Sequence, residues 1–278
     1  MAIVGLGLMG GSLGAALVQP RACRRVVGVA RREEAVRQAL EMGAIDEGTC
    51  SLQEGVAEAD IVVLATPVRS IMRLIESIGP MVTPGCVLTD LGSTKAAVVE
   101  RMQSLPPHVQ PIGGHPMCGK ESRGLSAADP GLFMGATYVL TPLVRTSDGA
   151  LALTAELVRA AGANPLVLEA SYHDLLAAAA SHLPYILSLG LVAAAESVGD
   201  DAVWKLAASG FRDTSRLAAS DETMMLDILL TNSSEVSGML SRFQHRLEEI
   251  ARLLDQDDEA GLQSVITAAS QRRRRLFS

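Results

Sequence analysis

A histidine in a segment rich in glycine and proline is the residue best suited to acid–base chemistry in this chain. His115 lies in Gly113-Gly114-His115-Pro116, and we expect this segment to be a rigid loop that follows a short strand. An imidazole titrates near neutral pH and can therefore serve as a general base. A loop histidine without further context is more often structural, so this segment alone does not decide the role of His115.

A serine follows a second apolar strand. Ser93 lies in Asp90-Leu91-Gly92-Ser93-Thr94-Lys95, directly after the strand expected over residues 86–90. Its hydroxyl could bond a substrate hydroxyl or the histidine. It could equally cap the helix expected from about residue 95 to 103, because serine is a favoured residue at helix starts.

Two arginines offer a site for a substrate carboxylate. Arg212 and Arg216 lie in a polar stretch within the helical half of the chain, and guanidinium groups bind carboxylates in a two-pronged geometry. An internal ion pair with Asp213 is the alternative.

His173 and His182 are nine residues apart, which does not suit one metal site, so we expect capping or core hydrogen bonds from them.

The element that organises the chain is its first turn, which has the pattern G-x-G-x-x-G. An apolar strand leads into Gly5, Gly7 and Gly10, and a helix-like stretch follows. Leu8 and Met9, within the turn, are also expected to bind the cofactor. The first glycine permits the tight turn, the second lets a pyrophosphate approach, and the third lets the helix pack on the strand. This pattern predicts a dinucleotide site in a Rossmann-like domain, and a glycine-rich turn without ligand is the alternative.

The second strand, over residues 25–30, ends in a way that distinguishes the two nicotinamide cofactors. An NAD site usually has an acidic residue here, whereas this chain has Ala30, Arg31 and Arg32. Guanidinium groups attract a 2′-phosphate, so the sequence favours NADP. The alternative is that both arginines are ordinary surface residues at a helix start, followed by Glu33 and Glu34.

Strands and helices alternate to about residue 169, which predicts an α/β fold with a doubly wound parallel sheet. Arg31, the pair Thr66-Pro67, Ser93 and His115 each follow a strand, so they should meet at one sheet edge. The remaining chain is expected to be helical. We therefore predict a dinucleotide-binding domain over 1–169 and an all-α substrate-binding and dimerisation domain over 170–278. The apolar helix expected over 174–197 suggests a homodimer.

Composition limits the other partners and the location. A net charge of −7 argues against nucleic-acid binding, and the basic run over 272–275 is better explained as a solvated helix end. The apolar stretch over 183–195 is too short to span a membrane. The four cysteines lack zinc or disulfide spacing, and no signal peptide is expected before the first strand. These features predict a cytoplasmic protein without a metal site.

Several segments, taken together, resemble the prephenate/arogenate dehydrogenases of tyrosine biosynthesis, and the similarity is strongest to the cyanobacterial, NADP-using arogenate dehydrogenases. They match in family order over nearly the whole chain: Gly5-Leu6-Gly7-Leu8-Met9-Gly10-Gly11-Ser12, Asp90-Leu91-Gly92-Ser93-Thr94-Lys95, Gly113-Gly114-His115-Pro116-Met117, Ser181-His182-Leu183-Pro184 and Gly210-Phe211-Arg212-Asp213-Thr214-Ser215-Arg216.

The resemblance implies oxidative decarboxylation of a cyclohexadienol without a metal. His115 matches the histidine that takes the hydroxyl proton, and Ser93 matches the serine that positions the hydroxyl. Arg216 matches the arginine that pairs with the ring carboxylate, with Arg212 next in line, and Glu121 falls where some members have a gating acid. His182 lies in the substrate-binding motif of the family.

One departure from the family pattern bears on the substrate. Prephenate-using members often have histidine where this chain has Tyr185, which favours arogenate and leaves prephenate as the alternative. A β-hydroxyacid dehydrogenase shares the glycine turn but needs a catalytic lysine at the start of the long helix, and residues 172–188 contain none. A non-catalytic NADP sensor would not need the histidine, serine and arginine.

Overall fold

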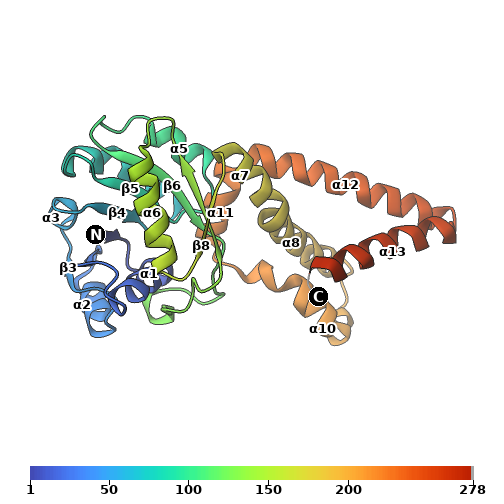
Figure 1. The fold of residues 1–278 in the computed structure, drawn as a ribbon. Coiled ribbons are helices and arrows are strands. Elements are labelled where there is room, and N and C mark those ends of the chain that lie inside the picture. Colours follow the sequence, from blue (N-terminus) through green and yellow to red (C-terminus); the bar gives the residue numbers. More distant parts are fainter. Residues whose placement is uncertain (277–278) are drawn as a thin grey trace. The chain divides into compact units, whose positions relative to one another are not determined.

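The computed structural model describes residues 1–276, and within them eight strands form one sheet in the order β3-β2-β1-β4-β5-β6-β7-β8 (Figure 1). Every neighbouring pair is parallel except β6 and β7, which run antiparallel. The strands are β1 (Ala2–Val4), β2 (Val27–Val29), β3 (Glu47–Thr49), β4 (Ile61–Leu64), β5 (Val87–Asp90), β6 (Gln110–Pro116), β7 (Thr137–Pro142) and β8 (Asn164–Val167).

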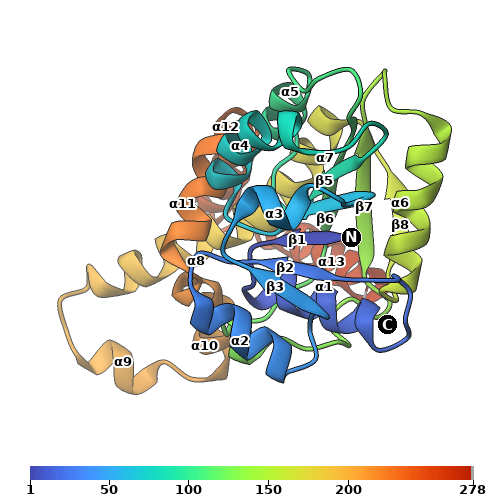
Figure 2. The same ribbon diagram turned by 90° about the vertical axis from the view of Figure 1, so that its left-hand side faces the viewer.

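Apolar strands let the sheet carry helices on both faces (Figure 2). Along β4, Ile61 and Val63 belong to one buried core and Val62 and Leu64 to the other, because successive side chains point to opposite faces. The first core also contains residues of α1 (Leu8–Val18), α2 (Glu33–Glu41) and α6 (Asp148–Ala160). The second contains residues of α3 (Leu52–Val56), α4 (Val68–Ile78) and α5 (Ala96–Met102).

The predicted doubly wound sheet followed by helices is confirmed, with local differences. Strand β3 and helix α3 were not predicted, because Glu47–Thr49 is polar and α3 has only five residues. No antiparallel pair was predicted either. The strand order reverses between β1 and β4, and such a reversal opens the crevice where doubly wound folds bind their ligands.

The chain divides into two compact units, Met1–Ser233 and Ser234–Ser278. The first unit therefore includes the sheet and the helices that follow it. Asp174 accepts hydrogen bonds from the N–H groups of Lys95 and Ala96 at the start of α5, and Asp227 pairs with Arg69 of α4, so side-chain bonds tie this helical part to the sheet part. Its elements are α7 (Ala170–Ala177), η3 (Ala178–His182), α8 (Leu183–Glu196), α9 (Ala202–Leu206), α10 (Ser209–Ser215), η4 (Arg216–Ala219) and α11 (Glu222–Thr231).

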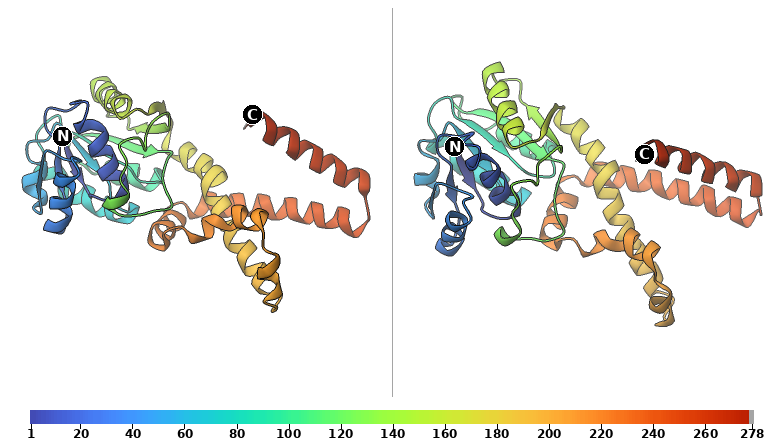
Figure 3. Two further views of the ribbon diagram at one scale, coloured as in Figure 1. Left: turned by 90° about the horizontal axis from the view of Figure 1, so that it is seen from below. Right: turned by 60° about the horizontal axis from the view of Figure 1, so that its bottom comes forward.

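The long apolar helix begins earlier than expected, at Ala170, and is interrupted by the π-helical turn η3. Pro184 follows this turn and has no N–H to donate, which accounts for a local change in the hydrogen-bond pattern. Both α10 and η4 pack against α8 (Figure 3).

The complete helical run over residues 170–196 is longer than the apolar stretch that the sequence analysis considered. With 27 residues and a mean hydropathy of 1.7 it could cross a membrane by length and composition. The whole helix is therefore not too short to span a membrane, unlike residues 183–195 alone. One such helix is weak evidence for a membrane span, because core helices of soluble proteins meet the same criteria.

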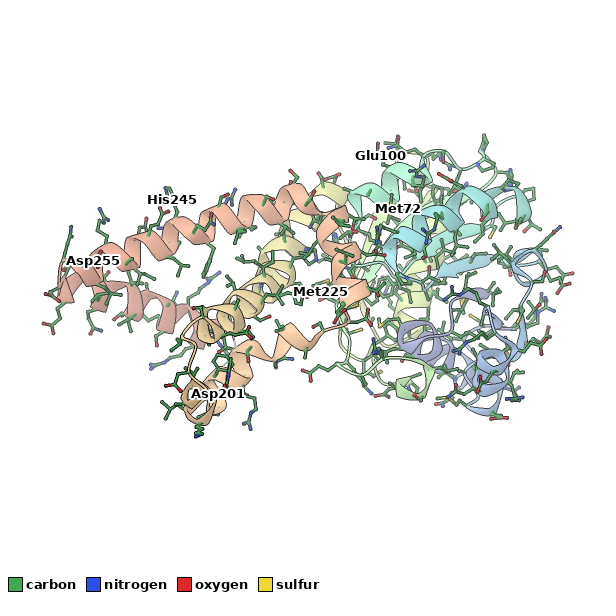
Figure 4. The ribbon with its side chains drawn as sticks, turned by 180° about the vertical axis from the view of Figure 1, so that it is seen from behind. Met72, Glu100, Asp201, Met225, His245 and Asp255 are labelled. Carbon is green, nitrogen blue, oxygen red and sulfur yellow. The ribbon has the colours of Figure 1, made fainter. Side chains whose placement is uncertain are left out.

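The second unit consists of most of α12 (Ser233–Asp255) and of α13 (Glu259–Leu276), joined by a short turn at Asp257. His245 and Asp255 lie along α12, and Figure 4 shows their positions. Several apolar side chains of this unit are exposed, among them Leu247, Leu254 and Ile266.

Candidate active site

The glycine turn has the geometry that a pyrophosphate needs. Gly5 has a φ of +107°, which favours glycine. A Cβ on Gly10 would lie 2.0 Å from the carbonyl oxygen of Gly5, whereas one on Gly7 would meet no atom within 4 Å. Gly10 thus lets helix and strand approach, and Gly7 faces open space. The helix α1 begins after Gly7 without a side-chain cap, so its first N–H groups are free to bind an anion.

Two further features beside this turn fit a dinucleotide. The hydroxyl oxygen of Thr66 is buried and has no hydrogen-bond partner within residues 1–276, and the Thr66 methyl group lies against Gly5. Pro67 starts the helix α4 that follows. Arg31 and Arg32, at the end of β2, are exposed, and neither side chain has an ion pair or hydrogen bond in the described part of the chain. Their guanidinium groups are therefore available to a phosphate.

The Asp90 carboxylate joins the two segments that carry Ser93 and His115. One oxygen accepts a hydrogen bond from the N–H of Gly92 at 2.7 Å, and the other from the N–H of Gly114 at 3.0 Å. Lys95 pairs with the same carboxylate, and both side chains are completely buried. A single buried ion pair thus fixes the backbone next to each candidate catalytic residue.

His115 lies within β6, so the expectation that it follows a strand in a loop is corrected. The antiparallel partner β7 extends β6 to Pro116 by pairing His115 with Val139 and Pro116 with Tyr138. Its ring is buried, and Nδ1 lies 2.8 Å from Nε2 of His173. Nε2 of His115 makes no hydrogen bond within residues 1–276, and the residue is 8% exposed.

The surroundings of His115 keep the imidazole neutral. Burial lowers its pKa well below the ordinary value of 6.5, and the positive charge of nearby Lys95 lowers it further. A neutral imidazole with one open nitrogen can accept a proton. The site therefore contains a group with the protonation state that a general base requires.

Ser93 does not cap the following helix. The N-cap position of α5 is Lys95, and the Ser93 hydroxyl makes no hydrogen bond to any residue in the described range 1–276. Ser93 is half-buried. Its hydroxyl is thus free to bind a ligand, and the capping alternative fails because the helix begins too late.

Sequence reasoning missed the roles of Lys95 and Asp174, although it foresaw core hydrogen bonds for the two histidines. Asp174 accepts from the N–H groups of Lys95 and Ala96 at 2.7 and 2.8 Å. The available signal was a charged residue beside a histidine in an otherwise apolar helix. Asn232 bonds Nδ1 of His182 at 3.1 Å, and burial lowers the His182 pKa to about 4.

The predicted carboxylate-binding residues lie on the exposed side of the helical part. Arg216 pairs with Glu121 at 2.7 Å, which brings two predicted substrate residues into direct contact. Arg212 lies 3.7 Å from Asp213, the internal ion pair considered as the alternative for this arginine. Tyr185 is buried in a small cluster with Met225 of α11, labelled in Figure 4, and Leu217, the neighbour of Arg216, packs against that cluster.

The candidate site contains no evident metal centre. Within residues 1–276, no group of three or more histidine, cysteine, aspartate or glutamate residues is arranged to hold a metal ion.

Comparisons with known proteins agree with these features. Residues 14–167 match the family model described as prephenate dehydrogenase, nucleotide-binding domain, and residues 169–268 match prephenate dehydrogenase, dimerization domain. Prephenate dehydrogenase of Bacillus subtilis is 33% identical over 264 residues, which cover 94% of this chain and 71% of that protein.

Two solved structures extend the similarity to the whole fold. Prephenate dehydrogenase from Aquifex aeolicus, in complex with hydroxyphenyl propionate and NAD+, has a TM-score of 0.92 and 27% identity over 99% of this chain and 97% of that chain. Synechocystis arogenate dehydrogenase has a TM-score of 0.86 and 29% identity over 99% of both chains.

Proposed function

Because the chain belongs to the prephenate/arogenate dehydrogenase family, we propose that it catalyses the NADP-dependent oxidative decarboxylation of arogenate to tyrosine. Prephenate, converted to 4-hydroxyphenylpyruvate, is the alternative substrate. The observation that carries the proposal is the neutral, buried His115 with an open Nε2, held by Asp90 next to the segment that carries Ser93.

The proposed roles follow from the chemistry of each side chain. His115 accepts the proton of the ring hydroxyl at Nε2, and the Ser93 hydroxyl orients that hydroxyl group. A nicotinamide cofactor held at the glycine turn would supply the acceptor for the hydride of the ring carbon that bears the hydroxyl. The ring then loses carbon dioxide and becomes aromatic, which makes the reaction favourable, so the protein chiefly aligns the reactants and removes one proton.

Arg216 is the proposed partner of the ring carboxylate. Its guanidinium group can hold a carboxylate through two parallel hydrogen bonds, and Glu121 occupies it with a carboxylate in the structure. A substrate carboxylate would therefore compete with Glu121, in keeping with a gating role for this acid. Arg212 is the second candidate for the carboxylate, and it lies 3.7 Å from Asp213, a longer contact than the 2.7 Å between Arg216 and Glu121.

Tyr185 supports arogenate over prephenate. Arogenate carries an ammonium group where prephenate carries a ketone, and a phenol oxygen can accept a hydrogen bond from an ammonium group. A protonated histidine at this position would instead repel that ammonium group. His182, one turn earlier in the same motif, is proposed to line the substrate site as a neutral side chain.

Arg31 and Arg32 support NADP over NAD. They are exposed at the end of β2, where a carboxylate would repel a 2′-phosphate and a guanidinium group attracts it. Gly5, Gly7, Leu8, Met9 and Gly10 would bind the pyrophosphate at the start of α1. Thr66 and Pro67 would line the same crevice from the end of β4.

We further propose a homodimer and a cytoplasmic location. Residues 1–169 would bind the dinucleotide, and 170–278 would bind substrate and form the dimer. The exposed apolar side chains Leu189, Leu247 and Ile266 and the description of the matching family model support this assignment. The four cysteines are free, as in proteins of a reducing compartment. Light scattering coupled to size-exclusion chromatography tests the dimer, and a monomer at micromolar concentration would contradict it.

Steady-state kinetics test the function directly. Formation of reduced cofactor should be measured with arogenate, prephenate and 3-hydroxyacids, each with NADP and with NAD. The proposal predicts the highest kcat/KM for arogenate with NADP. Higher kcat/KM for prephenate would select the alternative substrate, and turnover of a 3-hydroxyacid alone would overturn the assignment. NADP binding without any turnover would indicate a sensor.

A further inference from the structure

Three buried side chains form a continuous line from the proposed base to a carboxylate. Nδ1 of His115 lies 2.8 Å from Nε2 of His173, and Nδ1 of His173 lies 2.8 Å from Oδ1 of Asp174. His173 and Asp174 are 2% and 1% exposed. Neither residue has a role in the proposed reaction so far, although His173 contacts the base directly.

The donors and acceptors in this line fix where the hydrogens lie. The Asp174 carboxylate already accepts from the N–H groups of Lys95 and Ala96, so Nδ1 of His173 must donate to it. Nε2 of His173 then carries a lone pair. Nδ1 of His115 consequently carries the hydrogen of the His115–His173 bond, and the lone pair of His115 lies on Nε2.

The same contacts anchor the carboxylate. Asp174 bonds the first N–H groups of α5, and its carbonyl oxygen accepts a hydrogen bond from Asn232 at 2.8 Å. Strand β6, which carries His115, and helices α5 and α7 thus hold the line of side chains in place. Because Nε2 of His115 is the nitrogen without a partner among residues 1–276, this arrangement leaves its lone pair free to accept a proton.

We propose that His173 and Asp174 are positioning residues that hold His115 as the Nδ1–H tautomer, with Nε2 as the basic nitrogen. This inference rests on the proposed role of His115. When the substrate O–H bond breaks and an N–H bond forms at Nε2, the Nδ1 proton of His115 can move to Nε2 of His173. The positive charge then lies beside the Asp174 carboxylate. The proton stays within the line, and no further reactant is needed.

The tautomer can be observed without any substrate. Two-bond ¹H–¹⁵N spectra of protein labelled with ¹⁵N-histidine separate protonated from unprotonated ring nitrogens. The chain has five histidines, and His115→Asn and His173→Gln assign the two of interest. We expect a protonated Nδ1 and an unprotonated Nε2 for His115 at pH 7.5. A His115 protonated at Nε2 alone would overturn the proposal, whether or not the enzyme uses a dienol.

Two substitutions at one position test the effect on catalysis. His173→Leu removes the acceptor, whereas His173→Gln keeps an amide oxygen that can accept from Nδ1 of His115. We expect His173→Leu to lower kcat about 100-fold and to change the KM for the dienol by no more than about threefold. The kcat of His173→Gln should be at least about tenfold higher than that of His173→Leu. His108→Leu is the matched control, because the His108 ring makes no side-chain hydrogen bond within residues 1–276.

The outcomes separate this inference from the proposed function. Equal kcat values for His173→Leu and His173→Gln would overturn the positioning role. A wild-type enzyme that turns over no dienol would overturn the proposed function, while the ¹⁵N spectra would still decide the tautomer. If His173→Leu fails to fold, two measurements still test the inference: the ¹⁵N spectra of the wild type and the kcat of His173→Gln relative to wild type. An Nε2–H tautomer of His115 in the wild type would then contradict the inference.

Discussion

Asp90 and Lys95 form an ion pair that is completely buried between the sheet and α5. Burial lowers the pKa of Lys95, and the negative charge of Asp90 opposes that shift. Each charge thus offsets part of the cost of burying the other. The Asp90 carboxylate also bonds the N–H groups of Gly92 and Gly114. The pair therefore connects the stability of the fold to the position of the proposed base.

Replacing Lys95 should destabilise the protein strongly. Lys95→Met leaves the Asp90 carboxylate buried without its cation, and breaking such a pair costs about 3–5 kcal/mol. Urea denaturation measures the free energy of unfolding. Lys120→Met removes a half-exposed lysine from its pair with Asp129 and should have a much smaller effect. Equal decreases in the free energy of unfolding for Lys95→Met and Lys120→Met would show that the buried pair stabilises the fold no more than the exposed one.

His115→Asn should lower kcat about 10²- to 10⁴-fold, the usual contribution of a general base. NADP binding should stay within about twofold of wild type, because the substitution lies away from the glycine turn. Single-turnover kinetics and cofactor titration provide the two measurements. His108→Asn controls for loss of a histidine elsewhere. Near-normal kcat in His115→Asn would exclude this residue as the base.

The pH dependence of kcat/KM should reflect the lowered pKa of His115. The basic form is the neutral imidazole, which predominates at every pH above its pKa. Because burial places that pKa well below 6.5, kcat/KM should be constant from pH 8 to 6.5 and fall only at lower pH. Rates measured from pH 5 to 9, with unfolding checked at each pH, test this. A decrease centred at or above 6.5 would contradict it.

Substitutions at Arg216 and Glu121 should have opposite effects on the dienol KM. Arg216→Ala removes the proposed carboxylate partner and should raise KM about 10-fold or more. Glu121→Gln removes the competing carboxylate and should lower KM. Arg123→Ala is the comparison, because it breaks the neighbouring pair with Asp221 and leaves Arg216 untouched. An unchanged KM in Arg216→Ala would move the carboxylate contact elsewhere, with Arg212 next.

Removing both guanidinium groups at the end of β2 should weaken NADP binding selectively. The double substitution Arg31→Ala with Arg32→Ala is expected to raise the KM for NADP about 10-fold or more and change the KM for NAD about twofold at most. Arg37→Ala, an exposed arginine of the following helix, is the control. An equal loss for both cofactors would remove the basis of the NADP assignment.

Much of the fold could be predicted because its signals are local. Continuous apolar strands, glycine turns and alternating helices specify a doubly wound sheet. The short polar strand β3 carries no such signal, and the antiparallel pairing of β7 depends on the neighbour it meets. That pairing also extends β6 through His115, which sequence reasoning had assigned to a loop.

The candidate site was partly predictable for the same reason. Ser93, His115 and Arg216 remain predicted site residues, found from motifs and from positions after strands. The partners His173 and Asp174 are far from Ser93 and His115 in sequence, and no local pattern indicates that they meet. Lys95 is close to Ser93 in sequence, but its burial against Asp90 depends on the tertiary packing. The Asp174 carboxylate accepts a hydrogen bond from the N–H of Lys95, which is 79 residues away in the sequence.

The sequence by itself determined which chemical groups are available and the order of strands and helices that carries them, because periodicity, glycine and proline act on near neighbours. Only the tertiary structure decided which groups are buried together. It placed the Asp90 carboxylate between the loop after β5 and strand β6, joined His115 through His173 to Asp174, and paired Arg216 with Glu121. Burial and charge act through space, so the protonation and direction of the proposed base follow from packing.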